Sequence, residues 1–180
     1  MIPSEDQAHK LWEKYKLPAV KKNHVSLVAK VALFLAAKCE EVDPTIVINE
    51  HLLLVAALLH DLDKNIPKKP GEQHPDTGVR ILREEGMDEV ADLVKTHPLQ
   101  AILDPKLVPK TWEEKLLFLA DKMVKSEIIT VDERFKLWND EHLPPKEQAI
   151  LDACYPKVKA LEKEIFDFIK IRPEQVASIA

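Results

Sequence analysis

This chain of 180 residues has few glycines, few cysteines and little of the alternating pattern that indicates β-strands. It holds three glycines and two cysteines against thirteen prolines, and β-branched residues rarely alternate with polar ones. Apolar positions instead recur at steps of three and four, which is the helical period. The pattern predicts an all-α protein, and the length suits a single domain over 1–180 with a sizeable core.

Further shortages exclude several classes of protein. Cys39 and Cys154 lie far apart with no Cys-x-x-Cys motif, so we expect buried free thiols and no disulfide framework. A net charge of −5 gives no basic excess for bulk binding of nucleic acid. The first six residues are polar and acidic, unlike a secretory signal, and the longest apolar run is too short to span a bilayer. We therefore expect a cytoplasmic protein with no membrane partner.

The longest apolar run, residues 52–59, ends abruptly in ionisable side chains. His60 and Asp61 follow it directly, and Asp63 and Lys64 come next. A helix that is apolar on every side is normally buried, and a charge at the edge of a core costs free energy unless it is paired or bound to a metal. For the His-Asp pair alone, the plainer interpretation is a helix that ends with both aspartates in solvent.

Signals for helix starts and ends divide the rest of the chain. Asp43-Pro44-Thr45 is a good start for the helix that carries the apolar run, which we expect over 45–62. Thr111-Trp112-Glu113-Glu114 is a capping box. We expect the other helices near 6–16, 19–40, 74–85, 87–96, 111–122, 131–138 and 145–171. The last two are expected to pack on the core, with a contact between two copies in a homodimer as the alternative.

Four more polar residues lie at helix ends or on apolar stripes. His24 lies on the core-facing side of its helix, His74 precedes a proline at a helix start, and His97 ends a helix. Each histidine has an ordinary explanation, as a packed core residue, a boundary residue or a favourable partner of the helix macrodipole. Asp121 is less ordinary, because it extends an apolar face, where aspartate is rarely placed unless it is paired or bound to a cation.

These residues, taken together, suggest a metal site in a helical bundle. Side chains from neighbouring helices can converge on one point, and imidazole with carboxylate suits divalent transition metals. The ordered set His…His-Asp…Asp resembles the signature of the HD-domain superfamily of metal-dependent phosphohydrolases. Residues 58–64 (LLHDLDK), 74–82 (HPDTGVRIL) and 119–122 (LADK) look like its motifs. The resemblance spans about Asn23 to Glu127 and implies an HD-domain helical bundle, with its core over about 20–127 and additional C-terminal helices over about 131–172.

The resemblance also implies a set of metal ligands. The first site would have four of them: His24, His60, Asp61 and Asp121. In the binuclear branch of the family, which the bacterial enzymes represent and this chain resembles most, Asp61 would bridge to a second metal held by His74 and His97. That branch often has two consecutive histidines where His97-Pro98 stands, so Pro98 leaves open whether the second site forms. One or two divalent ions are implied, of manganese, iron, nickel, cobalt, magnesium or zinc.

The activity that the resemblance implies is hydrolysis of a phosphate ester or anhydride of a nucleotide or related small molecule, through a metal-activated water. Asp61 would fix the ions, and Lys64 is the best placed cation for the phosphate. Lys68 and Lys69 are candidate helpers, although loop lysines are ordinarily just solvated. Asp63 would accept a proton or orient the water, unless it pairs with Lys64. Weaker candidates for phosphate contacts are Lys122 and Arg80.

Two other classes of function stay open on the sequence alone. One is a non-catalytic module that binds metal and nucleotide, which Pro98 and the acidic composition favour. The other is a structural helical bundle in which the histidines are buried and hydrogen-bonded. Bound metal would exclude the structural bundle, and turnover of a phosphorylated compound would exclude the binding module.

Overall fold

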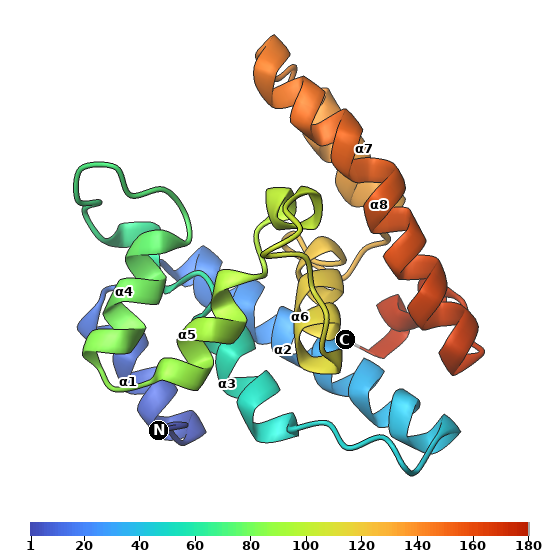
Figure 1. Cartoon of the computed structure of the whole chain (residues 1–180), viewed down its shortest axis with the longest axis horizontal. Helices are drawn as coiled ribbons and strands as arrows, with labels where there is room; N and C mark the ends of the chain where they lie inside the picture. Colours follow the sequence, from blue (N-terminus) through green and yellow to red (C-terminus); the bar gives the residue numbers. More distant parts are fainter. Residues whose placement is uncertain (180) are drawn as a thin grey trace.

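Helices make up the fold in the computed structural model, which describes residues 1–179 (Figure 1). The α-helices are α1 (Glu5–Lys14), α2 (Ala19–Val42), α3 (Glu50–Leu59), α4 (Asp76–Glu84), α5 (Asp88–Lys95), α6 (Trp112–Lys122), α7 (Val131–Asp140) and α8 (Pro145–Ile169). Short 3₁₀ helices are η1 (Leu62–Asn65), η2 (Leu99–Leu103) and η3 (Pro173–Ile179). Within residues 1–179 no strand forms, and only an isolated bridge pairs Val124 with Ile128. The predicted all-α class is confirmed.

Helix α3 lies at the centre of the fold, as the apolar run predicts. Its buried residues face every direction: Leu53, Val55, Ala56, Ala57, Leu58 and Leu59. It packs against α1, α2, α5 and α6. The indole N–H of Trp12 in α1 donates to the backbone carbonyl of Leu58 at 2.8 Å, which gives a partner to one of the carbonyls that the last turn of a helix leaves free. The C-terminal end of α3 is therefore held in place by a neighbouring helix.

The predicted bounds of this central helix are wrong at both ends. Asp43 does not cap it, because its carboxylate instead accepts hydrogen bonds from the backbone N–H (3.0 Å) and hydroxyl (2.6 Å) of Thr45 in a local turn. The helix begins at Glu50, where the side chain of Asn49 caps it by accepting from the backbone N–H of Leu52 at 2.9 Å. It ends at Leu59, and η1 follows, so His60 and Asp61 lie in the bend between two helices.

Helices α2 and α6 pack against each other and against α3. The predicted capping box starts α6: the Thr111 hydroxyl accepts from the backbone N–H of Glu114 at 3.2 Å, and the Glu114 carboxylate accepts from the backbone N–H of Thr111 at 3.0 Å. This packing brings His24, in the second turn of α2, beside Asp121, in the last turn of α6.

The C-terminal helices α7 and α8 lie side by side, and Figure 1 shows one end of this pair extending beyond the other helices. Helix α8 also contacts α2, α6 and η2. The division into a core and added C-terminal helices of one domain stays a prediction. Cys39 and Cys154 are both buried free thiols, as predicted, and burial raises the pKa of Cys39 to about 11. Among the described helices, none is long and apolar enough to cross a membrane.

Candidate metal centre

The six predicted metal ligands gather in one place, although they come from separate parts of the fold. Five of them line one cavity of about 270 Å³: His24, Asp61, His74, His97 and Asp121. The sixth, His60, is fully buried behind them. The plainer interpretation of the His-Asp pair, with Asp61 and Asp63 in solvent, is wrong, because each of these aspartates is only 4% exposed.

One half of the centre is built around Asp121. Its Oδ1 atom lies 3.0 Å from Nε2 of His24 and 3.3 Å from Nε2 of His60. The same Nε2 atom of His60 lies 4.0 Å from Oδ1 of Asp61. These four residues are the first ligand set that the resemblance implies, and α2, α6 and the end of α3 bring them together.

The other half joins His74 and His97 to Asp61. Nε2 of His74 lies 3.6 Å from Oδ1 of Asp61 and 3.0 Å from Nε2 of His97. Ligand atoms of His60, Asp61 and His97 all lie within 4.8 Å of one another. Asp61 thus stands between the two halves, where a bridging carboxylate would stand. Pro98 lines the cavity but offers no side-chain donor atom.

Each of the four imidazole rings is anchored through Nδ1. In His74 this atom lies 2.9 Å from both carboxylate oxygens of Asp63. In the other three rings it meets a backbone carbonyl oxygen: Lys125 for His24, Ala57 for His60 and Val94 for His97. Carbonyl and carboxylate oxygens only accept, so Nδ1 carries the proton in the neutral ring and Nε2 keeps its lone pair. This is the arrangement that partners of metal-binding histidines impose.

Electrostatics favour the cation-binding forms of Asp61, Asp121 and His97. For His60, burial alone would lower the pKa, but the neighbouring carboxylates Asp61 and Asp121 outweigh burial and raise it, so a metal must displace a proton from this ring. Burial alone would raise the pKa of Asp61, but the neighbouring charges of His60 and Lys64 outweigh burial and hold the pKa well below its usual value. For Asp121, burial is likewise outweighed, here by the charge of Lys122 and by the adjacent rings of His24 and His60, so its pKa is also lowered. Burial lowers the pKa of His97 well below its ordinary value. Both carboxylates are therefore ionised and His97 is neutral, as a metal ligand must be.

The donor atoms fit a divalent cation. Nε2 of His60 is buried without a hydrogen-bond partner in the described part of the chain, and an unpaired buried polar atom costs free energy. The facing Nε2 lone pairs of His74 and His97, 3.0 Å apart, repel each other unless a proton or an ion lies between them. Atoms that share one ion at about 2.1 Å are separated by roughly 3.0–3.4 Å. Imidazole and carboxylate donors without thiolate suit transition metals.

The other predicted site residues have different surroundings. Lys64 lines the cavity and lies 3.5 Å from Oδ1 of Asp61, and it does not pair with Asp63 within residues 1–179. Lys68 and Lys69 are exposed and lie outside the set of described residues that line the cavity, and their role as helpers stays a prediction. Lys21, which was not predicted, donates to Oδ2 of Asp61 at 3.0 Å. Its position three residues before His24, on the same helix face, is the signal that could have identified it.

Asp63 is buried beside His74 and does not line the cavity in the part of the chain that the structure describes. Helix α4 packs closely on it, since a Cβ atom at Gly78 would lie 3.5 Å from the Cβ of Asp63. Because its carboxylate accepts from Nδ1 of His74, Asp63 orients the His74 ring. Its predicted catalytic role in accepting a proton or orienting water stays a prediction.

Substitutions at Asp63 test this positioning. We expect Asp63→Ala to weaken metal binding at the His74 side by about 10–100-fold, because partners of ligating histidines contribute that much to affinity. Asp63→Asn keeps an oxygen that accepts from Nδ1 and should stay close to wild type. Titration calorimetry with Mn²⁺ measures both affinities. Equal affinity in wild type and Asp63→Ala would contradict the assignment.

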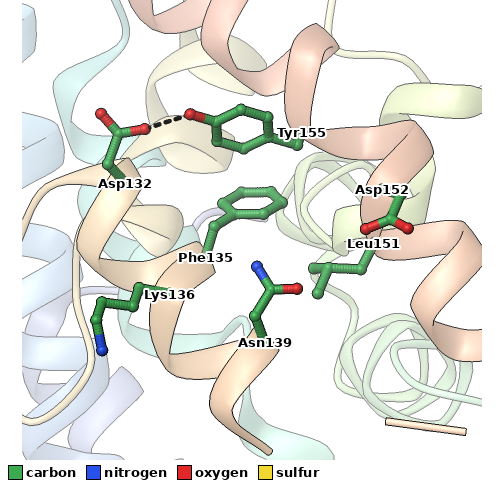
Figure 2. Close-up of a pocket in the computed structure, with 7 residues that line it drawn as sticks. All are labelled: Asp132, Phe135, Lys136, Asn139, Leu151, Asp152 and Tyr155. Atoms are coloured by element: carbon green, nitrogen blue, oxygen red, sulfur yellow. Dashed lines mark hydrogen bonds between the residues drawn. The ribbon is translucent and has the colours of Figure 1, made fainter. Parts of the chain in front are cut away.

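A second cavity, of about 450 Å³, lies between α7 and α8 (Figure 2). Its polar groups are already partly paired, since the Tyr155 hydroxyl donates to Asp132 at 2.6 Å and Lys136 contacts Asp140 at 2.9 Å. In Figure 2, Lys136 extends away from the rings of Phe135 and Tyr155. Among the described residues, no group of potential metal ligands lies there. The groups of potential metal ligands among the described residues all lie at the histidine-lined cavity.

Comparison with known proteins supports this location. A family model described as HD domain matches residues 22–125, which is more than half of the chain and includes all six ligands. The predicted superfamily is thereby confirmed, while the closer likeness to its binuclear bacterial branch stays a prediction. Searches among curated proteins and among solved structures gave no match.

Proposed function

This chain belongs to the HD-domain family, and on that premise we propose that it hydrolyses a phosphate ester or anhydride of a nucleotide or related small molecule. HD domains bind divalent metals, and the family consists mostly of metal-dependent hydrolases. The observation that carries the proposal is the convergence of four imidazole Nε2 atoms and two carboxylates at one cavity. A nucleotide is the proposed substrate class.

The proposed ligands divide into two sets that share a carboxylate. His24, His60, Asp61 and Asp121 would hold one ion, and Asp61, His74 and His97 would hold a second. Bound divalent ions at such a site polarise a phosphoryl oxygen and lower the pKa of water. The anchored Nδ1 atoms keep the rings from turning, so the donor atoms stay aimed at the same point.

Lysines on the cavity wall give the chain its own means of attracting a phosphate. Lys21 and Lys64 contact the two oxygens of Asp61, and their side chains are 34% and 31% exposed. When a cation neutralises Asp61, these ammonium groups lose most of their attraction to the carboxylate. Both are long, flexible and partly exposed, so they can then reach an anionic substrate in the cavity.

Hydrolysis assays test the proposal. The purified protein is incubated with manganese, cobalt, nickel or iron and with nucleotides or bis(p-nitrophenyl) phosphate. We expect turnover only with metal, and we expect Asp61→Ala and His60→Ala to lose at least about 100-fold, since even the partners of metal ligands contribute 10–100-fold. His51→Ala is the matched control, because His51 is exposed on the same helix, α3.

The outcomes separate the classes of function. Absence of turnover with every metal, or turnover that survives both substitutions, would contradict the enzyme proposal. Tight nucleotide binding without turnover would favour the non-catalytic metal and nucleotide-binding module. A protein that binds no metal would favour a structural helical bundle.

A further inference from the structure

Arg134 is a cationic side chain at the cavity wall that has no anionic partner among residues 1–179. It lies on α7, outside residues 22–125 that the family model matches, and it is half-buried. Its Nε and Nη1 atoms are buried and find no hydrogen-bond partner among the residues that the structure describes. A buried polar group without a partner costs free energy, and a charged one costs more. An unpaired buried group of this kind in a folded protein therefore calls for an explanation, such as binding of a ligand.

The other cations of the cavity are already paired. Lys21 and Lys64 contact the two oxygens of Asp61, and Lys122 donates to Asp121 at 2.7 Å. Within the described chain Arg134 forms no ion pair within 4.0 Å; burial lowers its pKa, and the charges of Asp121, Glu141 and Asp61 are close enough to oppose that shift. Arg134 thus lines the same cavity as the two metal-binding carboxylates, Asp61 and Asp121, without pairing with either of them.

Trp138 holds the guanidinium in place. It lies four residues after Arg134 on the same face of α7, and its ring centroid is 4.1 Å from the Cζ atom of Arg134. The Phe135 ring lies nearly perpendicular to the same indole, with centroids 5.1 Å apart. A cation stacked on an indole is attracted by the ring quadrupole and loses little further freedom when it binds a ligand. The fork of N–H donors is therefore pre-oriented.

The chemistry of this position fits a phosphoryl group. The planar guanidinium matches a pair of phosphate oxygens with two parallel hydrogen bonds. Metal ions at the histidine cluster would neutralise Asp61 and Asp121 and leave Arg134 as uncompensated positive charge opposite them. The cavity of about 270 Å³ is at the small end for ligand sites. It suits a phosphoryl group and its immediate neighbours, with the rest of a larger ligand passing half-buried Trp138 towards solvent.

We infer that Arg134 binds non-bridging phosphoryl oxygens of the substrate, and that Trp138 positions its guanidinium. The inference takes the phosphorylated ligand from the proposed function and deepens it, because it makes α7 part of the substrate site. The HD core would then supply the metal ligands, and the helix that follows would supply the phosphate clamp. Substrate preference would depend on α7 as well as on the core.

Binding of inorganic phosphate to the manganese-loaded protein tests the inference without turnover. We expect Arg134→Met to weaken phosphate binding about 10–100-fold, because hydrogen bonds to charged groups are lost, and Arg134→Lys to restore only part of it. Lys136→Met is the matched control, since Lys136 is exposed on the same helix and does not line the histidine-lined cavity. Calorimetry gives the affinities, metal analysis the manganese content and thermal unfolding the folded state.

Unchanged phosphate affinity in Arg134→Met, no phosphate binding by the wild type, or a parallel loss of manganese would each remove Arg134 as the phosphate ligand. Should Arg134→Met fail to fold, Arg134→Lys and Trp138→Phe must still weaken phosphate binding at wild-type manganese content. Phosphate binding that depends on Arg134 in a protein without turnover would sink the proposed function and leave this inference intact. Turnover with wild-type KM in Arg134→Met would support the proposed function and remove this inference.

Discussion

Replacing Asp121 with alanine is expected to lower the free energy of unfolding of the metal-free protein by about 3–5 kcal/mol, because it strands a buried charge. Lys122 is 2% exposed, and its ammonium group donates to Asp121 at 2.7 Å and to the backbone carbonyl of His97 at 2.6 Å. Burial lowers the pKa of Lys122, and the charge of Asp121 opposes that shift. Without the Asp121 carboxylate, the ammonium group still bears the free-energy cost of desolvation but loses the attraction that mainly offset it.

The partner substitution distinguishes this cause from a general packing defect. Lys122→Met removes the charge itself and keeps most of the apolar stem, so it should be much milder than Asp121→Ala. It gives up only the contact of the ammonium nitrogen with the Phe118 ring, whose centroid lies 4.2 Å away. The double variant Asp121→Ala/Lys122→Met should recover most of the loss, since it leaves no buried lysine charge. Urea denaturation in the presence of EDTA measures all three. If the double variant were as unstable as the sum of the single ones, the stranded charge would not be the cause.

The central helix shows where sequence patterns predict a fold well and where they fail. The run of apolar residues identified α3 as the buried post, because a helix that is hydrophobic on every face is stable in water only when it is surrounded by protein. Its start was missed because Asp43 and Asn49 are both good caps, and the competition between them is decided by tertiary contacts. The Glu113 carboxylate accepts from the backbone N–H of Asn49 at 2.8 Å, a contact between residues 64 positions apart that no local pattern contains.

The candidate site was predictable to the extent that its residues violate local rules. Burying a polar side chain costs free energy unless the side chain has a function. Each of two residues can therefore be recognised as a candidate ligand on its own: Asp121 on an apolar helix face, and His60 at the end of a buried run. The role of Asp63 could not be predicted, because its contact with Nδ1 of His74 depends on how α4 packs on η1. Arg134 was missed for a similar reason. An arginine on an amphipathic helix is ordinary until the fold buries it beside the carboxylates.

Adding metal should stabilise the protein strongly. A ligand that binds only the folded state contributes about 4 kcal/mol when its concentration is a thousand times Kd, which corresponds to a rise of roughly 8–16 °C in Tm for a chain of this size. His60→Ala should abolish most of that rise, because His60 supplies a fully buried donor atom. His51→Ala, exposed on α3, should keep it. Thermal unfolding with and without Mn²⁺ makes the measurement, and an unchanged Tm in the wild type would contradict metal binding.

The number of ions that each chain binds shows whether the second metal site forms although Pro98 offers no donor atom. We expect two per chain, since the Nε2 atoms of His74 and His97 lie 3.0 Å apart and Asp61 stands between the two halves of the centre. His74→Ala should reduce the count to one and keep part of the stabilisation, because the His74 side chain is 24% exposed and its loss leaves the first ligand set intact. Metal analysis after dialysis against Mn²⁺ gives the count. One ion in both the wild type and His74→Ala would mean that the second ligand set, to which Pro98 adds no donor atom, is too weak to bind.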